Sequence, residues 1–219
     1  ELVRQTMIER YGLDAYNLGW NIYTTLDTEM QNHAEDAIFK NIEVYSERYG
    51  WIEKNNFAEE LGDQFFDQII LNGPSIIFDA VDEADDSESI FNKLGEIFES
   101  HKIPDRYLRA LVADVQKDQV TVLTENYDKE ILIWDDQYDW ARKRSNNRKG
   151  PKPDNFFDLV RKGDLVTLSS SESNQRIIQI PPAEVAFVSM NPKNGHIKTY
   201  IGGTNFLKTK FDRVRQSFP

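Results

Sequence analysis

The sequence predicts an α+β fold, in which a small antiparallel β-barrel follows helical segments and precedes a β-hairpin. Two observations lead to this prediction. Apolar residues recur with the period of a helix between residues 30 and 49, and the period changes to the alternation of strands after residue 107. The 219 residues, 39% of them hydrophobic, are enough to bury the cores of one or two domains.

Residues 1–52 are predicted to form an interdomain linker that contains a strand and a helix. Residues 19–25 alternate and favour the extended state, which predicts the strand. Asp27 and Thr28 are candidates for the N-cap of the helix, and its apolar stripe continues until Gly50 predicts its end.

Residues 53–106 are predicted to form an acidic, partly helical insert. Between residues 53 and 99 there are thirteen acidic and two basic side chains, which equals the net charge of the whole chain, −11. This shift indicates a segment with its own surface, inserted into or packed beside a balanced protein; a solvated face that only aids solubility is the alternative. Apolar content too high for disorder and a helical stripe over residues 87–100 indicate that the insert is folded.

Residues 107–182 are predicted to form an OB-like antiparallel barrel, closed or partly open. A short helix near residues 154–161 is expected between the third and fourth strands, and Pro181-Pro182 is expected to end the domain as a stiff linker. The five predicted strands are residues 108–115, 119–125, 130–134, 164–168 and 176–180.

Residues 183–219 are predicted to begin a further, truncated domain. Strands over residues 185–190 and 196–201 flank a five-residue loop, in which Asn194 and Gly195 can adopt positive φ. An isolated hairpin is marginal in water, so we expect this one to have little to pack on until its domain continues.

The composition and the motifs exclude several functions. Without cysteine, the chain has no disulfide scaffold, thiolate zinc site or thiol nucleophile. The histidines His33, His101 and His196 match no metal-binding pattern, and no phosphate-binding or serine-nucleophile motif occurs. No apolar run approaches the roughly 18–20 residues that cross a bilayer, and the first residues are unlike a signal peptide. We therefore expect a soluble chain with no catalytic residue, cofactor or metal site.

One region suggests a binding surface, because basic and aromatic side chains alternate there. The stretch from residue 142 to residue 152 has six bases and no acid, which is typical of surfaces that contact glycans, single strands or acidic proteins. A solvated loop, or one paired with the acidic insert, is the alternative that we favour, and the overall acidity argues against nucleic acid. The candidate contacts are Trp134, Tyr138, Trp140, Arg142, Lys143, Arg144, Arg148 and Lys149.

Several motifs, in order along the chain, resemble class A penicillin-binding proteins of the 1A type. They are residues 9–27 with Tyr-Thr-Thr-Leu-Asp at their end, residues 45–50, Trp140-Ala141, residues 186–195 with Asn-Pro-Lys-Asn-Gly, Gly202-Gly203, and Arg215-Gln216. The resemblance does not extend to residues 53–99.

Proteins of this family are anchored in the bacterial inner membrane, and they polymerise and crosslink peptidoglycan in the periplasm. The resemblance implies a linker between the glycosyltransferase and transpeptidase domains, an inserted barrel, and the opening hairpin of the transpeptidase. The catalytic Ser-x-x-Lys would follow Arg215-Gln216, so no catalytic residue is transferred. Relatives use the inserted domain to bind an outer-membrane lipoprotein activator.

Our leading hypothesis is a non-catalytic linker and docking region of a bifunctional peptidoglycan synthase, which spaces the catalytic domains and binds a regulatory envelope lipoprotein or another protein of cell-wall synthesis. The alternative is a glycan-binding module that guides nascent peptidoglycan strands. A third hypothesis, that the chain is itself an enzyme, predicts labelling by a fluorescent β-lactam, which we do not expect because the nucleophile is absent.

Overall fold

The computed structural model describes residues 2–17, 19–52, 55–72, 85–146, 148–169, 175–180, 183–205 and 209–217. Its α-helices are α1 (Leu2–Tyr11), α2 (Thr28–Tyr49), α3 (Ala58–Leu61), α4 (Asp63–Asn72), α6 (Asp85–Ser100), α7 (Phe156–Leu159) and α8 (Arg213–Gln216), with 3₁₀ turns η1 (Leu13–Tyr16) and η3 (Asp136–Tyr138). Its strands are β1 (Leu108–Val115), β2 (Gln119–Thr124), β3 (Lys129–Ile133), β4 (Arg144–Ser145), β5 (Arg148–Lys149), β6 (Leu165–Leu168), β7 (Ile177–Ile178), β8 (Phe187–Met190) and β9 (Ile197–Ile201). Among the described residues, none of the helices has both the length and the apolar character that crossing a bilayer requires.

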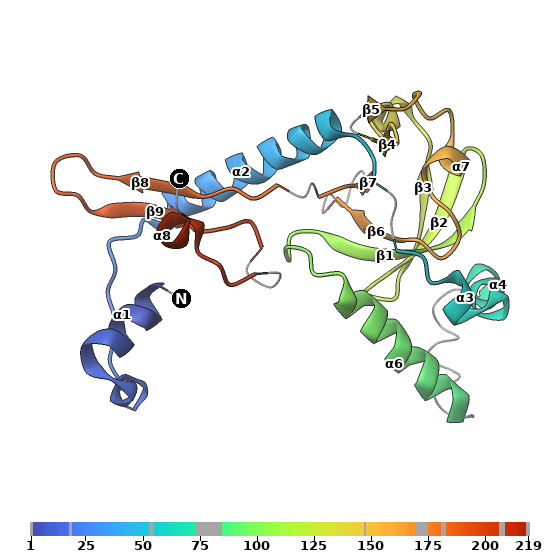
Figure 1. Ribbon diagram of the computed structural model, residues 1–219. Coiled ribbons are helices and arrows are strands. Elements are labelled where there is room, and N and C mark those ends of the chain that lie inside the picture. Colours follow the sequence, from blue (N-terminus) through green and yellow to red (C-terminus); the bar gives the residue numbers. More distant parts are fainter. Residues whose placement is uncertain are drawn as a thin grey trace.

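Five strands form one antiparallel sheet in the order β3-β2-β1-β6-β7. The pairing of β1 with β2 is irregular between Val112 and Asp114, and such a bulge bends a strand and increases its twist. The curled sheet, with α7 between its third and fourth strands, confirms the predicted OB-like α+β fold (Figure 1). The two-residue strands β4 and β5, which pair with each other, were not predicted.

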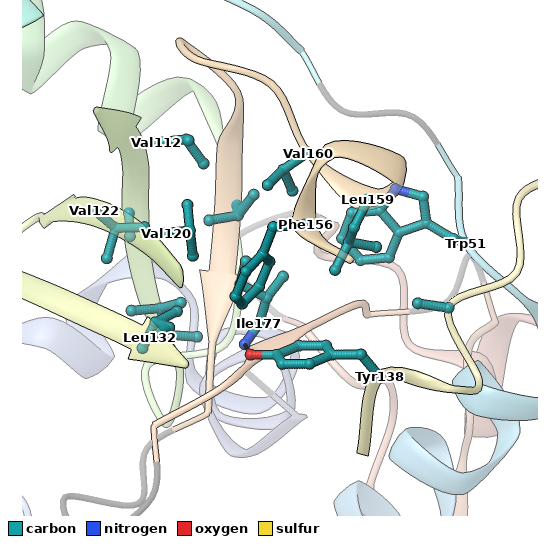
Figure 2. Packing of buried hydrophobic residues seen from close by; sticks show 14 residues of the cluster. Trp51, Val112, Val120, Val122, Leu132, Tyr138, Phe156, Leu159, Val160 and Ile177 are labelled. Atoms are coloured by element: carbon teal, nitrogen blue, oxygen red, sulfur yellow. Dashed lines mark hydrogen bonds between the residues drawn. The ribbon is translucent and has the colours of Figure 1, made fainter. Parts of the chain in front are cut away.

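Both faces of the sheet carry buried side chains over most of its strands. One face packs on α7 and on Trp51, with Val112, Val120 and Phe156 in its centre (Figure 2). The other face, which includes Leu111 and Leu123, packs on α4 and α6, and the buried side chains of these helices include Phe65, Phe66, Ile69, Leu94, Ile97 and Phe98. The helices of the acidic insert therefore complete the core of the barrel.

Helix α2 is the longest element, with 22 residues. Asp27 caps its first turn by accepting a hydrogen bond from the Met30 amide at 3.2 Å, and the chain leaves the helix at Gly50 with φ 95°. The predicted helix is therefore confirmed. In Figure 1, α2 runs from the β8-β9 hairpin at its first turns to the barrel at its last.

The strand predicted over residues 19–25 is wrong. These residues lie in an irregular segment, and its side chains are exposed, Tyr23 by 91%. Only the end of the segment approaches the hairpin, where Thr25 Oγ1 donates to the Ile197 carbonyl at 2.7 Å and the Asp27 amide donates to the Lys198 carbonyl at 2.9 Å. Strand preference without a face to bury was not enough to form a strand.

The predicted C-terminal hairpin is present as β8 and β9. In its loop Gly195 adopts φ 71°, whereas Asn194 does not take positive φ. The expectation that the hairpin has little to pack on is wrong, because Gln31 of α2 exchanges two hydrogen bonds with the Tyr200 backbone, at 2.9 and 3.3 Å. Pro181-Pro182, the predicted stiff linker, lies outside the described residues.

Candidate functional site: the joint between helix α2 and the barrel

The basic hairpin β4-β5 binds the C-terminal end of helix α2. Arg144 Nη1 donates to the Tyr49 carbonyl at 3.0 Å, and Lys149 Nζ donates to the Glu47 carbonyl at 3.1 Å. The Arg144 guanidinium also lies 4.1 Å from the centre of the Tyr49 ring. The last carbonyls of a helix lack helical partners and carry the negative end of its dipole, so two cations stabilise this end.

Backbone pairing continues the joint beyond the end of the helix. The Trp51 amide donates to the Arg142 carbonyl, and the Arg144 amide donates to the Trp51 carbonyl, both at 2.9 Å. A Cβ atom on Gly50 would lie 2.8 Å from the Arg142 carbonyl oxygen, and its φ of 95° also favours glycine. The indole of Trp51 is buried, 5.9 Å from the ring of Trp140. The joint therefore depends on a close approach of two backbones.

Gln179 connects the end of the sheet to the same joint. Its side chain is buried, its Nε2 donates to the Gly50 carbonyl at 2.8 Å, and its Oε1 accepts from the Ile52 amide at 2.7 Å. A single amide side chain thus pairs with a donor and an acceptor of the chain that leaves α2. Buried polar groups that are paired in this way favour one arrangement, because another would leave them without hydrogen-bond partners.

A second set of contacts lies nearer the middle of α2. The Arg106 guanidinium pairs with Asp36 at 3.0 Å and lies 4.5 Å from the centre of the Phe39 ring. The hydroxyl of Tyr107 donates to Glu43 Oε1 at 2.9 Å. Burial, and then the Glu43 carboxylate, raises the pKa of Tyr107, so the hydroxyl stays protonated and remains a donor. The barrel is therefore attached to α2 at two places.

A cleft of about 450 Å³ lies between these attachments and the C-terminal part of the chain. Phe39 and Ile42 of α2 line it on one side, and His101 and Asn205 are among its polar lining residues. The side-chain Nδ2 of Asn205 donates to the Lys102 carbonyl at 2.9 Å, which connects the C-terminal part to the barrel. In the part of the chain that the structure describes, no three acidic or histidine side chains are grouped as metal ligands.

The aromatic members of the predicted contact surface lie mostly in the core. Tyr138 is only 2% exposed, its oxygen accepts a hydrogen bond from the Ile177 amide at 3.2 Å, and burial raises its pKa to about 12 (Figure 2). Trp134 stacks on Tyr138 with ring centres 5.1 Å apart, and Trp134 and Trp140 are half-buried. The Tyr138 ring is thus not at the surface, contrary to the surface role expected for it.

The basic members of that surface gather on and beside the β4-β5 hairpin. Arg144 and Lys149 bind the end of α2, and Arg142 Nε donates to the Gly150 carbonyl at 2.7 Å. Lys143 and Arg148 are exposed. A glycan or partner contact at these exposed bases stays a prediction.

Gln179, Arg106 and Tyr107 were not among the predicted site residues. Gln179 carries a usable signal, because a glutamine between Ile177, Ile178 and Ile180 has the neighbours of a buried residue and must find polar partners. Arg106 and Tyr107 carry no such signal, since their partners lie more than sixty residues away.

Replacing Tyr138 by phenylalanine is expected to reduce the free energy of unfolding by about 1–3 kcal/mol, because the buried Ile177 amide loses its acceptor. The ring packing against Trp134 and Phe156 is retained. Urea unfolding followed by tryptophan fluorescence measures the change. The exposed Tyr23→Phe is the matched control and is expected to stay within about 0.5 kcal/mol. Equal values for the two variants would contradict the role given to the hydroxyl.

Comparison with known proteins shows which protein family has this architecture. Residues 74–183, about half of the chain, match the family model described as the penicillin-binding protein OB-like domain. The chain belongs to the penicillin-binding proteins. The match begins inside the acidic insert, which corrects the expectation that no resemblance covers residues 53–99.

Relatives of the penicillin-binding protein 1A type align with nearly the whole chain. The protein of that name from Vibrio cholerae is 30% identical over 99% of this chain, and those from Pseudomonas aeruginosa and Escherichia coli K12 are each 27% identical over the same share. These alignments cover 24%, 23% and 23% of the relatives, so the chain spans about a quarter of their length. The chain therefore corresponds to one part of a penicillin-binding protein of the 1A type.

The crystal structure of penicillin-binding protein 1A from Haemophilus influenzae shares the fold. Its TM-score with this chain is 0.69 at 22% sequence identity, and the superposition covers 99% of this chain and 27% of that one. The arrangement of linker helix, OB-like barrel and hairpin is thus that of a solved member of the family.

Proposed function

We propose that this chain is a non-catalytic linker and docking region of a bifunctional peptidoglycan synthase, which spaces the two catalytic domains and binds a regulatory envelope lipoprotein. The parent protein would be anchored in the inner membrane, with this region on its periplasmic side. The observation that carries the proposal is the attachment of helix α2 at both ends, to the hairpin by Gln31 and to the barrel by Arg144 and Gln179.

Helix α2 has the properties of a spacer. Its 22 residues make it about 33 Å long. The hydrogen bonds of Thr25 and Gln31 hold the hairpin at its first turns, while Arg106 and Arg144 hold the barrel at its middle and last turns. A helix that is attached to one unit at its first turns and to another at its last turns keeps these two units at a fixed distance.

The burial of the aromatic rings favours protein docking over glycan binding. A glycan-binding module needs exposed rings on which sugars stack, but of the three rings in the expected surface Tyr138 is in the core, and Trp134 and Trp140 are half-buried. The exposed surface is instead rich in acidic side chains, since α4 and α6 turn their apolar sides to the sheet and leave Asp67, Glu96 and Glu99 exposed. Such a surface suits a partner with basic side chains.

A pull-down with purified outer-membrane lipoproteins tests the docking function. Deleting the insert would remove part of the barrel core, so the test neutralises its exposed acids with Asp67→Asn, Glu96→Gln and Glu99→Gln. We expect binding that weakens with salt and is reduced about tenfold by the triple variant. The matched control is the triple variant Glu9→Gln, Asp14→Asn and Glu29→Gln, three exposed acids outside the insert, which is expected to bind normally. Absent binding, or binding that neither salt nor the first variant changes, would contradict the proposal.

The joint itself is tested by Gln179→Leu. This variant leaves the Gly50 carbonyl and the Ile52 amide without partners, so we expect a loss of about 2–4 kcal/mol in the free energy of unfolding. Amide hydrogen exchange of Ile52 should become faster even where the sheet stays protected. Gln116→Leu, at an exposed glutamine, is the control and should change stability by about 0.5 kcal/mol or less. Unchanged exchange at Ile52 would show that Gln179 does not hold the joint.

A further inference from the structure

We propose that the open edge of strand β3 binds an extended, positively charged segment of a partner protein, which adds a strand to the barrel sheet. This inference rests on the docking function proposed above and assigns it a place. Strand β3 comprises Lys129–Ile133 and ends the sheet, and among the described strands only β2 pairs with it.

The register of the sheet shows which backbone groups of β3 are open. The Trp134 amide donates to the Asp118 carbonyl at 2.9 Å, and the Thr124 amide donates to the Asp128 carbonyl at the same distance. Because hydrogen-bonded pairs alternate along antiparallel strands, the two residues of β3 in step with these, Glu130 and Leu132, direct their amides and carbonyls toward β2. The backbone groups of Lys129, Ile131 and Ile133 therefore point outward, where another strand could pair with them.

The outward-pairing positions also carry exposed apolar side chains. Ile131 is 52% exposed and Ile133 is 62% exposed, while Leu132 between them is buried. Isoleucine favours strands, and two of them at alternate positions form the apolar row that an added strand would cover.

Native edge strands are usually protected by a lysine that projects from them, and β3 lacks this protection. Lys129 is its one lysine, and Lys129 Nζ donates to the Ile70 carbonyl of α4 at 2.6 Å. The cation is thus occupied with the neighbouring helix, while the two isoleucines that follow it remain exposed.

The negative charge around β3 determines which kind of strand can bind to its edge. Asp128 precedes the strand, Glu130 lies within it, and Asp118 lies across from its end. Asp118 and Asp128 are exposed, and in the described part of the chain none of these three acids forms an ion pair. This charge repels anionic ligands and also a second copy of β3, which would bring the same acids together. It attracts a strand in which basic side chains alternate with apolar ones.

The direct test uses a synthetic peptide of seven alternating lysine and valine residues, capped at both ends, and the ¹⁵N-labelled chain. On addition of the peptide, amide exchange at Lys129, Ile131 and Ile133 is expected to slow about tenfold, while exchange at Glu130 and Leu132, already bonded to β2, changes little. A matched peptide of glutamate and valine is expected not to bind. Binding of both peptides, or slower exchange at other sites only, would overturn the proposal.

Variants separate strand addition from unspecific attraction. Ile131→Pro removes an outward amide and no bond to β2, so the sheet is expected to persist while peptide affinity falls about tenfold. Ile131→Thr combined with Ile133→Thr provides a second test that keeps strand preference, and Phe157→Thr, at an exposed apolar residue on α7, is the control. Unchanged affinity in both edge variants would overturn the inference.

Two further results would assign the edge of β3 a different occupant or move the docking site elsewhere on the chain. Reversible self-association of the chain that Ile131→Pro abolishes would assign the edge to a second copy and overturn the proposed occupant. Lipoprotein binding that depends on the acids of the insert but not on Ile131 would leave the docking function standing and show that β3 is not its site.

Discussion

Replacing Phe66 by alanine is expected to reduce the free energy of unfolding of the barrel by about 3–5 kcal/mol. Phe66 lies on α4, in the acidic insert, and its ring is completely buried against the sheet, in one cluster with Leu111 and Leu123. Its loss removes apolar contacts and leaves a cavity that neighbouring side chains fill only in part. Because α4 and the sheet share this core, the whole barrel should lose stability in one transition.

Urea unfolding followed by circular dichroism and by tryptophan fluorescence measures this loss. The four tryptophans lie outside α4, so a fluorescence midpoint that moves with the circular dichroism midpoint reports on the sheet and its surroundings. Asp67→Ala, at the next residue on the exposed side of α4, is the matched control and should change stability by about 0.5 kcal/mol or less. A Phe66→Ala variant that loses no more than the control would show that the insert is not part of the core.

The insert illustrates what charge can and cannot predict. The excess of acids marked residues 53–99 as a segment with its own surface, and about half of its described exposed residues are acidic. Charge describes the side that faces water, however, and says nothing of the side that faces the sheet. The apolar residues Phe65, Ile69 and Leu94 carried that information, but their partners in β1 and β2 are distant in the sequence.

Several regular elements with a buried face were predictable from period alone, whereas helix α4, which also has a buried face, was not predicted. The helix α2, the helix α6 and the strands of the sheet follow the period of their apolar residues. Residues 19–25 show the limit of this argument. Their side chains alternate as clearly as those of the strands, but they remain exposed because they do not pack on a core. The strands β4 and β5 have two residues each, which is too few to show a period in the sequence.

The joint was less accessible to sequence reasoning than the fold. The basic stretch was recognised by its composition, although not as a hairpin, and its contacts at the end of α2 depend on Arg144 and Lys149 reaching carbonyl groups about a hundred residues away. Backbone carbonyls leave no mark in a sequence, since every residue has one. Gly50 was correctly predicted to end the helix, whereas its second function, close approach to the Arg142 backbone, has no separate signal.

Gly50→Ala is expected to have a large effect for this reason, reducing the free energy of unfolding by about 3 kcal/mol or more. Gly50 adopts φ 95° and ψ 173°, a conformation that residues with a Cβ atom rarely take. The new Cβ atom would also lie 2.8 Å from the Arg142 carbonyl oxygen, the acceptor for the Trp51 amide. The backbones of α2 and the basic hairpin must then separate, which weakens the contacts of Arg144 and Gln179 as well.

Gly62→Ala separates the two causes, because Gly62 has a similar conformation, φ 78° and ψ 157°, with no atom within 4 Å of a new Cβ. Gly62→Ala is expected to reduce the free energy of unfolding by about 1–3 kcal/mol, because it introduces only the strain of the backbone. The additional loss of stability in Gly50→Ala, compared with Gly62→Ala, then measures the cost of separating the two backbones. Faster amide exchange at Trp51 should accompany this additional loss. If both variants lost the same stability and Trp51 kept its protection, the close approach of the two backbones would not hold α2 against the barrel. The proposed spacer function of α2 would then have to rest on the contacts of Arg106 and Tyr107.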